Sequence, residues 1–332
     1  MPAPKPSLKA VRRTDFPPRP KRADDQRSRT AFPQARLIPV PGHGPEDVVF
    51  DDAGRAITGL ETGAIVAVDL DTSKTSVLGN TGGRPLGLEM LPDGRLIICD
   101  AHRGLLRMDC VTGEIEELVR TVQGKPLVFC SNATAGSDGT IWFTESTSRF
   151  TFEHYLGAVL EQRATGRLMR RDPDGSVHVL LDGLDFANGV TLTGDESAVI
   201  FAETMGPTLK RYDLASGEVT VLADNLPGYP DNVSRSADGR FWVAICNLRD
   251  KLLESLAPRP TWIRQALWAL PDRFKPEGVR TTWVMAFGEN GELLADLQEP
   301  RDDFHMVTGV AERGGRLVLS SIKRDGLLVL DR

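Results

Sequence analysis

Cysteine and histidine, the side chains with the most versatile chemistry, are few in this sequence and show no recognised spacing. The four cysteines lie inside apolar, strand-like runs, without a Cys-x-x-Cys or Cys/His cluster: Cys99, Cys110, Cys130 and Cys246. Buried thiols are therefore expected, and a cysteine-based zinc site is not indicated. The chain also lacks Gly-x-Ser-x-Gly, His-Glu-x-x-His and a Gly-rich nucleotide loop before a helix. Serine-hydrolase, zinc-protease and dinucleotide chemistry consequently have no support.

Charge and hydropathy exclude further classes of protein. A net charge of −6 argues against a dedicated nucleic-acid binder. No run approaches the roughly 18 consecutive apolar residues of a membrane span, so no membrane span is expected. The N-terminus lacks the apolar stretch of a secretory signal, and a cytoplasmic location is expected. A small-molecule substrate is the expected partner, and the oligomeric state is left open.

Residues 1–34 form a Pro-rich, basic N-terminal arm. The first 30 residues hold nine Lys and Arg against three Asp, a net +6 in a chain that is otherwise −12. With almost no large apolar side chains, the arm is expected to be disordered or loosely draped. Its deletion is then expected to leave thermal stability nearly unchanged. A solvated tail and a tail that binds an anionic partner are the two alternatives.

A repeated strand–turn–strand unit organises the rest of the chain, residues 35–332. A short apolar run, a turn of the Asp-Gly type and a second apolar run recur six times: 48–59, 88–100, 133–145, 190–203, 233–245 and 310–321. Second hairpins such as LMRRDPDGSVHVLL lie between most copies. Turns repeating at about 40–45 residues are typical of propeller blades with four strands each. The predicted fold is all-β, a six-bladed β-propeller.

Two irregular segments fit this fold. The last copy is one strand short, and residues 35–40 are expected to complete its blade and close the ring. Residues 248–282 interrupt the fifth blade and are not strand-like. Trp262, Ile263, Ala266, Leu267 and Leu270 fall on one helical face there, between Pro260 and Pro271. This insertion is predicted to be helical, either a lid over one end of the ring or a brace packed beside it.

Several of the turn segments resemble one known family. GPEDVVFD, GGRPLGLEMLPDGRLIICD, FANGVTLTGDES and YPDNVSRSADGRFWVAI occur in order and are similar to the gluconolactonase and strictosidine synthase-like propellers, within the calcium-dependent phosphotriesterase superfamily. The resemblance runs from about residue 40 to the C-terminus. It implies one divalent cation on the propeller axis, held by oxygen ligands at the start of the inner strands.

The resemblance carries over to three positions. Glu46 (GPEDV), Asn188 (FANGV) and Asp231 (YPDNV) match the family's metal ligands, and Asp231 and Glu46 its catalytic carboxylates. Carboxylate and amide oxygens suit Ca²⁺ best, with Mg²⁺, Mn²⁺ and Zn²⁺ as alternatives. Each of the three residues has an equally simple structural interpretation, since Asp and Asn cap turns and Glu46 can lie in a solvated loop.

Two other positions depart from the resemblance. The family's Asn-Asp before the third inner strand is replaced by Ser131 and Asn132, which are kept as substrate-binding candidates. Thr308 stands where strictosidine synthase has a glutamate on the sixth blade, so condensation of an amine with an aldehyde is not expected. Further substrate-binding candidates come from loops that flank inner strands and from aromatic neighbours of the implied ligands: Arg84, His305, Phe186 and Tyr229.

The resemblance therefore implies a metal-dependent hydrolase of a cyclic ester, of the lactonase type. A lyase or isomerase that uses the same metal site is one alternative. A propeller that binds a small molecule without catalysis is another, because the fold alone does not determine the function.

Overall fold

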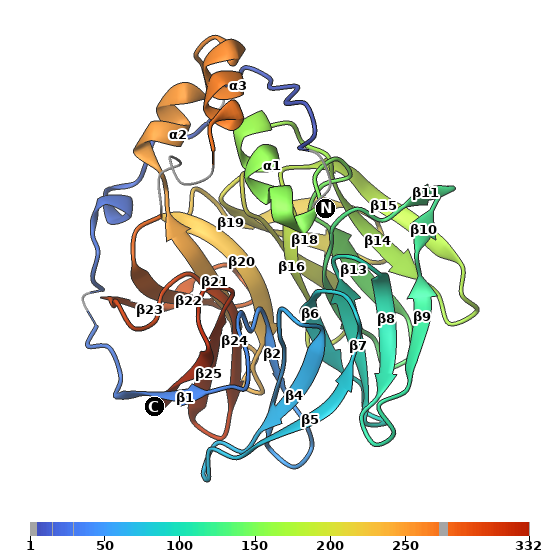
Figure 1. Ribbon diagram of the computed structural model, residues 1–332. Helices are drawn as coiled ribbons and strands as arrows, with labels where there is room; N and C mark the ends of the chain where they lie inside the picture. Colours follow the sequence, from blue (N-terminus) through green and yellow to red (C-terminus); the bar gives the residue numbers. More distant parts are fainter. Residues whose placement is uncertain (1–4, 15, 29, 272–277, 332) are drawn as a thin grey trace.

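The protein is described here by a computed structural model, which covers residues 5–14, 16–28, 30–271 and 278–331. Within these residues the strands form six four-stranded antiparallel sheets and one short hairpin (Figure 1). The inner strands of the six sheets contact one another in a closed ring, β2–β6–β12–β16–β20–β24. The predicted six-bladed propeller is confirmed.

The blades follow the chain from inner to outer strand. The first three are β2 Val48–Phe50, β3 Ala56–Gly59, β4 Ala64–Val68 and β5 Thr75–Asn80; β6 Pro85–Met90, β7 Arg95–Asp100, β8 Gly104–Asp109 and β9 Ile115–Val119; and β12 Cys130–Ala135, β13 Ile141–Glu145, β14 Gly166–Arg171 and β15 Val177–Leu184. The others are β16 Ala187–Leu192, β17 Ala198–Glu203, β18 Thr208–Asp213 and β19 Val219–Ala223; β20 Gly228–Arg235, β21 Phe241–Leu248, β22 Thr281–Phe287 and β23 Leu293–Pro300; and β24 Val307–Arg313, β25 Arg316–Ser321, β26 Gly326–Asp331 and β1 Ala35–Pro39. The hairpin is β10 Thr121–Val122 with β11 Lys125–Pro126.

The ring closes where the sequence predicted. Strand β1 pairs antiparallel with β26, from Ala35 opposite Leu330 to Pro39 opposite Gly326. The sixth blade is thus built from both ends of the propeller, and the outer edge of β26 is covered by β1. Between blades the core is formed by facing apolar sheets. Ile57 and Ile65 of the first blade, for example, pack against Ile98 of the second.

A polar ring crosses the channel at the start of the inner strands. The residues immediately before the first channel-lining apolar positions alternate around the six blades: Asp47, Gly87, Asn132, Gly189, Asn232 and Gly309. Asp47 Oδ2 accepts the backbone N–H of Leu88 at 3.0 Å and the side-chain amide of Asn132 at 3.1 Å. Asn132 Oδ1 accepts the N–H of Val190 at 3.1 Å. Asp47 thus bonds to the second and third blades, and Asn132 to the first and fourth.

The glycines leave room for the polar side chains of this ring. A Cβ on Gly189 would lie 2.3 Å from Val233 N and 2.5 Å from Asn232 Cα, which are backbone atoms that cannot rotate away. Gly189→Ala is therefore expected to lower the free energy of unfolding by about 3 kcal/mol, the upper range for overpacking.

Denaturant unfolding of Gly189→Ala beside Gly206→Ala measures this effect. A Cβ on Gly206 would meet side-chain atoms and no backbone, with Glu203 Oε2 at 3.1 Å, Glu203 Cβ at 3.3 Å and Thr208 Oγ1 at 3.6 Å, so that variant is the matched control. Equal stabilities for the two variants would mean that the ring is not tightly packed.

The insertion in the fifth blade is helical, as predicted, but a different face is buried. It contains α2 Lys251–Leu256, whose N-terminus is capped by the side chain of Asp250, and α3 Thr261–Ala269. Residues 272–277 of the predicted insertion lie outside the described residues. On α3 the buried side chains are Arg264 and Trp268, whereas Trp262 is 65% exposed. Of the predicted apolar face, Leu267 packs against the cluster around Trp268, whereas Trp262 and Leu270 are exposed. The arm and the third blade cover the opposite side of the helix.

A second helical segment interrupts the third blade between β13 and β14. It consists of η2 Phe152–His154 and α1 Tyr155–Glu161. Arg264 of α3 donates to Leu160 O at 2.9 Å and to Gln162 Oε1 at 2.8 Å, which joins the two segments. In Figure 1 the three α-helices gather on one side of the propeller. These three helices, together with η2, are called the cap below.

The N-terminal arm packs on the cap, contrary to the expectation of a loosely draped tail. Leu8 is 7% exposed and belongs to an apolar cluster with Phe150, Leu160 and Trp268. Extended arm residues are fixed through their backbone, with Val11 N–H donating to Glu161 O at 3.1 Å and Trp268 Nε1 donating to Pro6 O at 3.0 Å. The low apolar content of the arm predicted a loosely draped tail because it says nothing about backbone hydrogen bonds, and these make most of the contacts of the arm with the helices.

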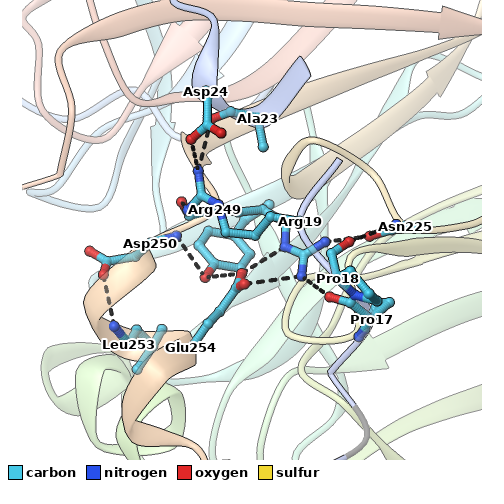
Figure 2. A network of polar contacts seen from close by, with 11 residues as sticks. Pro17, Pro18, Arg19, Ala23, Asp24, Asn225, Arg249, Asp250, Leu253 and Glu254 are labelled. Carbon is cyan, nitrogen blue, oxygen red and sulfur yellow. Dashed lines mark hydrogen bonds and ion pairs between the residues drawn. The ribbon is translucent and has the colours of Figure 1, made fainter. Parts of the chain in front are cut away.

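The next part of the arm enters a polar network with the start of α2 (Figure 2). The fully buried Arg249 bonds to both carboxylate oxygens of Glu254, at 2.6 and 3.1 Å, and to Pro17 O at 2.8 Å. Arg19 donates in turn to the carbonyl of Arg249 and pairs with Asp24 at 3.1 Å, at the end of η1 Lys21–Asp24. The arm thus ties α2 and α3 to the body of the propeller.

Candidate functional site

The candidate site lies at the cap end of the channel, where the inner strands begin. Glu46, Asn188 and Asp231, which come from three blades, are 6%, 5% and 7% exposed. Ser131 Oγ donates to Asn188 Oδ1 at 3.0 Å, and Asn188 Nδ2 donates to Thr204 Oγ1 at 3.2 Å, whose hydroxyl donates to Pro230 O at 2.7 Å, directly before Asp231. The propeller therefore places residues 185 positions apart at one end of one channel.

Glu46 is held on both sides. Its backbone carbonyl accepts the hydroxyls of Thr308 at 2.6 Å and Ser320 at 2.8 Å, so Thr308 of the sixth blade positions the glutamate. Its carboxylate accepts both of its contacts from the Asn232 side-chain amide, at 3.3 Å each. The carboxylate is thus fixed in direction while remaining in the channel.

Burial of several carboxylates makes this end of the channel electrostatically unfavourable without a cation. Burial, with repulsion from Asp231 and Asp47, raises the pKa of Glu46 well above its usual range. Burial also raises the pKa of Asp47 to about 7 and that of Asp231 to about 7. Arg84 is the cation whose charge opposes this shift at Glu46. Three carboxylates against one guanidinium leave room for a divalent positive charge.

The donor set fits a cation only when amides are included. Within the described residues, no three His, Cys, Asp or Glu side chains form a group able to hold a metal ion. Asn232, however, has a buried Oδ1 with no hydrogen-bond partner in the described part of the chain. Glu46, Asn188, Asp231 and Asn232 together offer hard oxygen donors of the kind that Ca²⁺ takes in proteins.

The other sequence candidates separate into two groups. Phe186 and Arg84 lie at the site: Phe186 packs edge-on against Phe129 at 5.7 Å, and Arg84 lies over the ring of Phe152 at 5.1 Å. Tyr229 is used for bracing, since its hydroxyl donates to Glu254 Oε1 at 3.3 Å and accepts from Asp250 N at 3.1 Å. His305 is half-buried and contacts Arg324.

Asn132 belongs to the polar ring below the site, where both ends of its amide are occupied by Asp47 and Val190 N. Beyond this ring the channel widens into a cavity of about 450 Å³ at the opposite end. Asp47 and Asn132 line that cavity, together with Glu89, whose pKa burial raises to about 7. The ring therefore separates the candidate site from a second, open compartment.

Sequence reasoning missed Asn232, Cys246 and Tyr155. Asn232 directly follows Asp231 in the same PDNV motif, so the motif contained the signal. Cys246 Sγ donates to Tyr229 O at 3.4 Å, and burial, together with the charge of Asp231, raises the pKa of its thiol well above the usual range. Tyr155 begins α1, and burial raises its pKa to about 12, with the charges of Cys246 and Asp231 adding to the shift. No repeat unit marks Tyr155, because it lies in the blade-three insertion.

Comparison with known proteins now adds to this geometry. The profile described as the SMP-30/Gluconolactonase/LRE-like region matches residues 57–253, more than half of the chain. The chain belongs to this family. A second profile, strictosidine synthase-like, N-terminal, matches residues 30–68. The family resemblance inferred from the turn motifs is therefore confirmed.

Two relatives of this chain have names that point to different roles. The chain is 36% identical over 293 residues to the strictosidine synthase-like 13 protein of Arabidopsis thaliana, covering 77% of this chain and 72% of that protein. It is 34% identical over 267 residues to the adipocyte plasma membrane-associated protein of Salmo salar, covering 75% of this chain and 63% of that protein. In the described residues, none of the helices has the length and apolar character needed to cross a membrane.

Solved structures of the family share the fold. A gluconolactonase from Xanthomonas campestris superposes with a TM-score of 0.67 at 19% identity, over 98% of both chains. Regucalcin from Agrobacterium tumefaciens, described as a calcium-binding protein, gives 0.65 at 16% identity, over 91% of this chain and 95% of that one. At these identities the likeness establishes the propeller, and the chemistry has to be argued from the site.

Proposed function

We propose that this protein is a divalent-cation-dependent hydrolase of cyclic esters, with its active site at the cap end of the channel. The observation that carries the proposal is the convergence of buried carboxylates and amides, with the Asn232 oxygen unpaired. Membership of a family that includes gluconolactonases supports the lactone as substrate class. Ca²⁺ is the expected ion, with Mg²⁺, Mn²⁺ and Zn²⁺ as alternatives.

Each residue has a distinct role in this proposal. Glu46, Asn188, Asp231 and Asn232 hold the ion, which when bound supplies Lewis acidity at a carbonyl oxygen. Asp231 accepts a proton from the attacking water, a role that suits a carboxyl whose pKa burial raises to about 7. The aromatic side chains of the cap exclude bulk water, which strengthens the electrostatic interactions below them.

Turnover of simple lactones with and without metal tests the proposal. Hydrolysis of γ- and δ-lactones, followed by proton release, is expected to stop in chelator and to return when Ca²⁺ or Mn²⁺ is added. Undiminished hydrolysis by metal-free protein would contradict the role of the cation. Cation binding without hydrolysis of any lactone would favour a propeller that only binds its ligand.

A further inference from the structure

Arg84 is a buried guanidinium with unused hydrogen-bonding capacity. The residue is 3% exposed, and its Nη2 donates to Gly44 O at 2.8 Å. Its Nε and Nη1 are buried and have no partner among the described residues. Guanidinium N–H groups cannot lose their protons in a protein, so these donors remain unsatisfied until an acceptor arrives.

The arginine is fixed in position by its neighbours. Its backbone N–H donates to Asp100 Oδ1 at 3.1 Å and its carbonyl accepts from Ala101 N at 2.8 Å, while Pro85 follows it in the chain. Its side chain lies over the ring of Phe152 in the cap. A guanidinium held in this way loses little entropy when it binds a ligand.

The nearby carboxylates do not neutralise Arg84 directly. Glu46, Glu61, Asp100 and Glu153 attract it, and the described residues form no ion pair with it. Glu46 accepts hydrogen bonds from Asn232, and Asp100 accepts backbone N–H groups through Oδ1, while its buried Oδ2 has no partner among the described residues and forms no bond to Arg84. Glu153 bonds to His102 at 2.5 Å. The unpaired N–H groups are therefore left to a ligand.

The surroundings favour an anion at this place. Phe152 lies against the guanidinium and belongs to an aromatic cluster with Phe129 and Phe186, with edge-on ring contacts at 5.7 Å between Phe129 and each of the other two. In such apolar surroundings a guanidinium–carboxylate pair is much stronger than in water. A divalent ion on Glu46 and Asp231 would neutralise these two carboxylates and so reduce the repulsion that a substrate anion meets at the site.

We propose that Arg84 binds a carboxylate of the substrate, so that the preferred substrates are lactones of hydroxy acids that keep a second, free carboxylate. This inference rests on the proposed function and narrows it to a charge class. The carbonyl under attack then lies toward Asp231, and the free carboxylate lies toward Arg84 on the second blade.

A matched pair of lactones tests the inference. 5-Oxotetrahydrofuran-2-carboxylate and its 2-carboxamide share ring, size and reacting bond, and differ only in charge. The native protein is expected to show a kcat/KM at least about 10-fold higher for the carboxylate, as charged hydrogen bonds imply. In Arg84→Met the ratio of the two values is expected to fall to about one.

Arg107→Met is the control, because Arg107 lies on β8 of the same blade and pairs with Glu116 of the outer strand β9. It should keep the native ratio. Arg84→Lys, which retains the charge, serves if Arg84→Met does not fold, and it should keep part of the preference. Equal use of both lactones by the native protein would overturn the inference and leave the proposed function standing.

A binding measurement keeps the two claims separable if neither lactone is hydrolysed. Calorimetric titration of the carboxylate lactone should then show binding to the native protein and at least about 10-fold weaker binding to Arg84→Met. Such a result would support Arg84 as an anion site while contradicting hydrolysis. Equal affinities for the carboxylate and the carboxamide would contradict the anion site itself.

Discussion

Asp231→Asn is expected to reduce lactone turnover by at least about 10³-fold, while the propeller stays folded. The substitution removes the proposed base and one charge from the donor set together, and general-base catalysis alone is worth about 10²–10⁴-fold. The fold should survive because the amide fits the same space. The neutral amide also avoids the free-energy cost of burying a charged carboxylate, which is the cost that raises the pKa of the native carboxyl to about 7. Steady-state kinetics with a thermal unfolding curve measure both effects.

Glu46→Gln separates binding of the ion from chemistry. Glu46 is expected to act on affinity for the cation, so excess Ca²⁺ should restore much of the turnover of this variant but none of that of Asp231→Asn. If both variants kept native turnover, the carboxylates at the cap end would be structural. The reacting groups would then have to lie elsewhere in the channel.

Removal of residues 1–29 is expected to lower the melting temperature by about 5 °C or more. The deletion exposes the apolar cluster around Trp268 and removes the Arg22–Asp296 ion pair, in which the guanidinium also stacks on Trp283 at 4.6 Å. Burial of Leu8 alone is worth about 1.5–3 kcal/mol, and each lost hydrogen bond about 1 kcal/mol. Calorimetry measures the shift in melting temperature. For each kcal/mol of lost stability this shift is smaller in a protein of this size than in a small domain.

Two neighbouring arginines provide the control for the arm. Arg13 pairs with Asp185 at 2.8 Å, whereas Arg12 is exposed. Arg13→Ala should therefore lower the melting temperature, and Arg12→Ala should not. An unchanged melting temperature in both Arg13→Ala and the deletion would restore the interpretation of the arm as a solvated tail.

The parts of the fold that sequence predicted are those encoded locally. Asp-Gly turns and alternating apolar residues fix hairpins over a few positions, and six such units with one missing strand specify a closed ring. The first strand, residues 35–40, could be placed by the same logic. The arm could not, because its partners Glu161, Arg249 and Trp268 are more than 100 residues away in sequence.

The candidate site was predictable in part for a similar reason. Glu46, Asn188 and Asp231 stand in motifs at the start of inner strands, so the propeller itself brings them to one end of the channel. Asn132 stands one position further along its strand, in the place equivalent to Asp47, and its side chain joins the ring with Asp47. When the six blades are aligned, the ring position alternates between a polar residue and glycine, and this alternation distinguishes it from the site position one residue earlier. Tyr155 and Phe152 come from an insertion whose position over the site no local pattern encodes.

Calorimetric titration of metal-stripped protein with Ca²⁺ tests the central claim, a single cation at the cap end of the channel, most directly. The native protein is expected to bind one ion per chain. Glu46→Gln and Asp231→Asn should each weaken binding by at least about 10-fold, equivalent to about 1.4 kcal/mol. Glu89→Gln, in the compartment on the other side of the polar ring, should bind like the native protein. No binding to the native protein, or binding that neither of the first two substitutions weakens, would contradict the account.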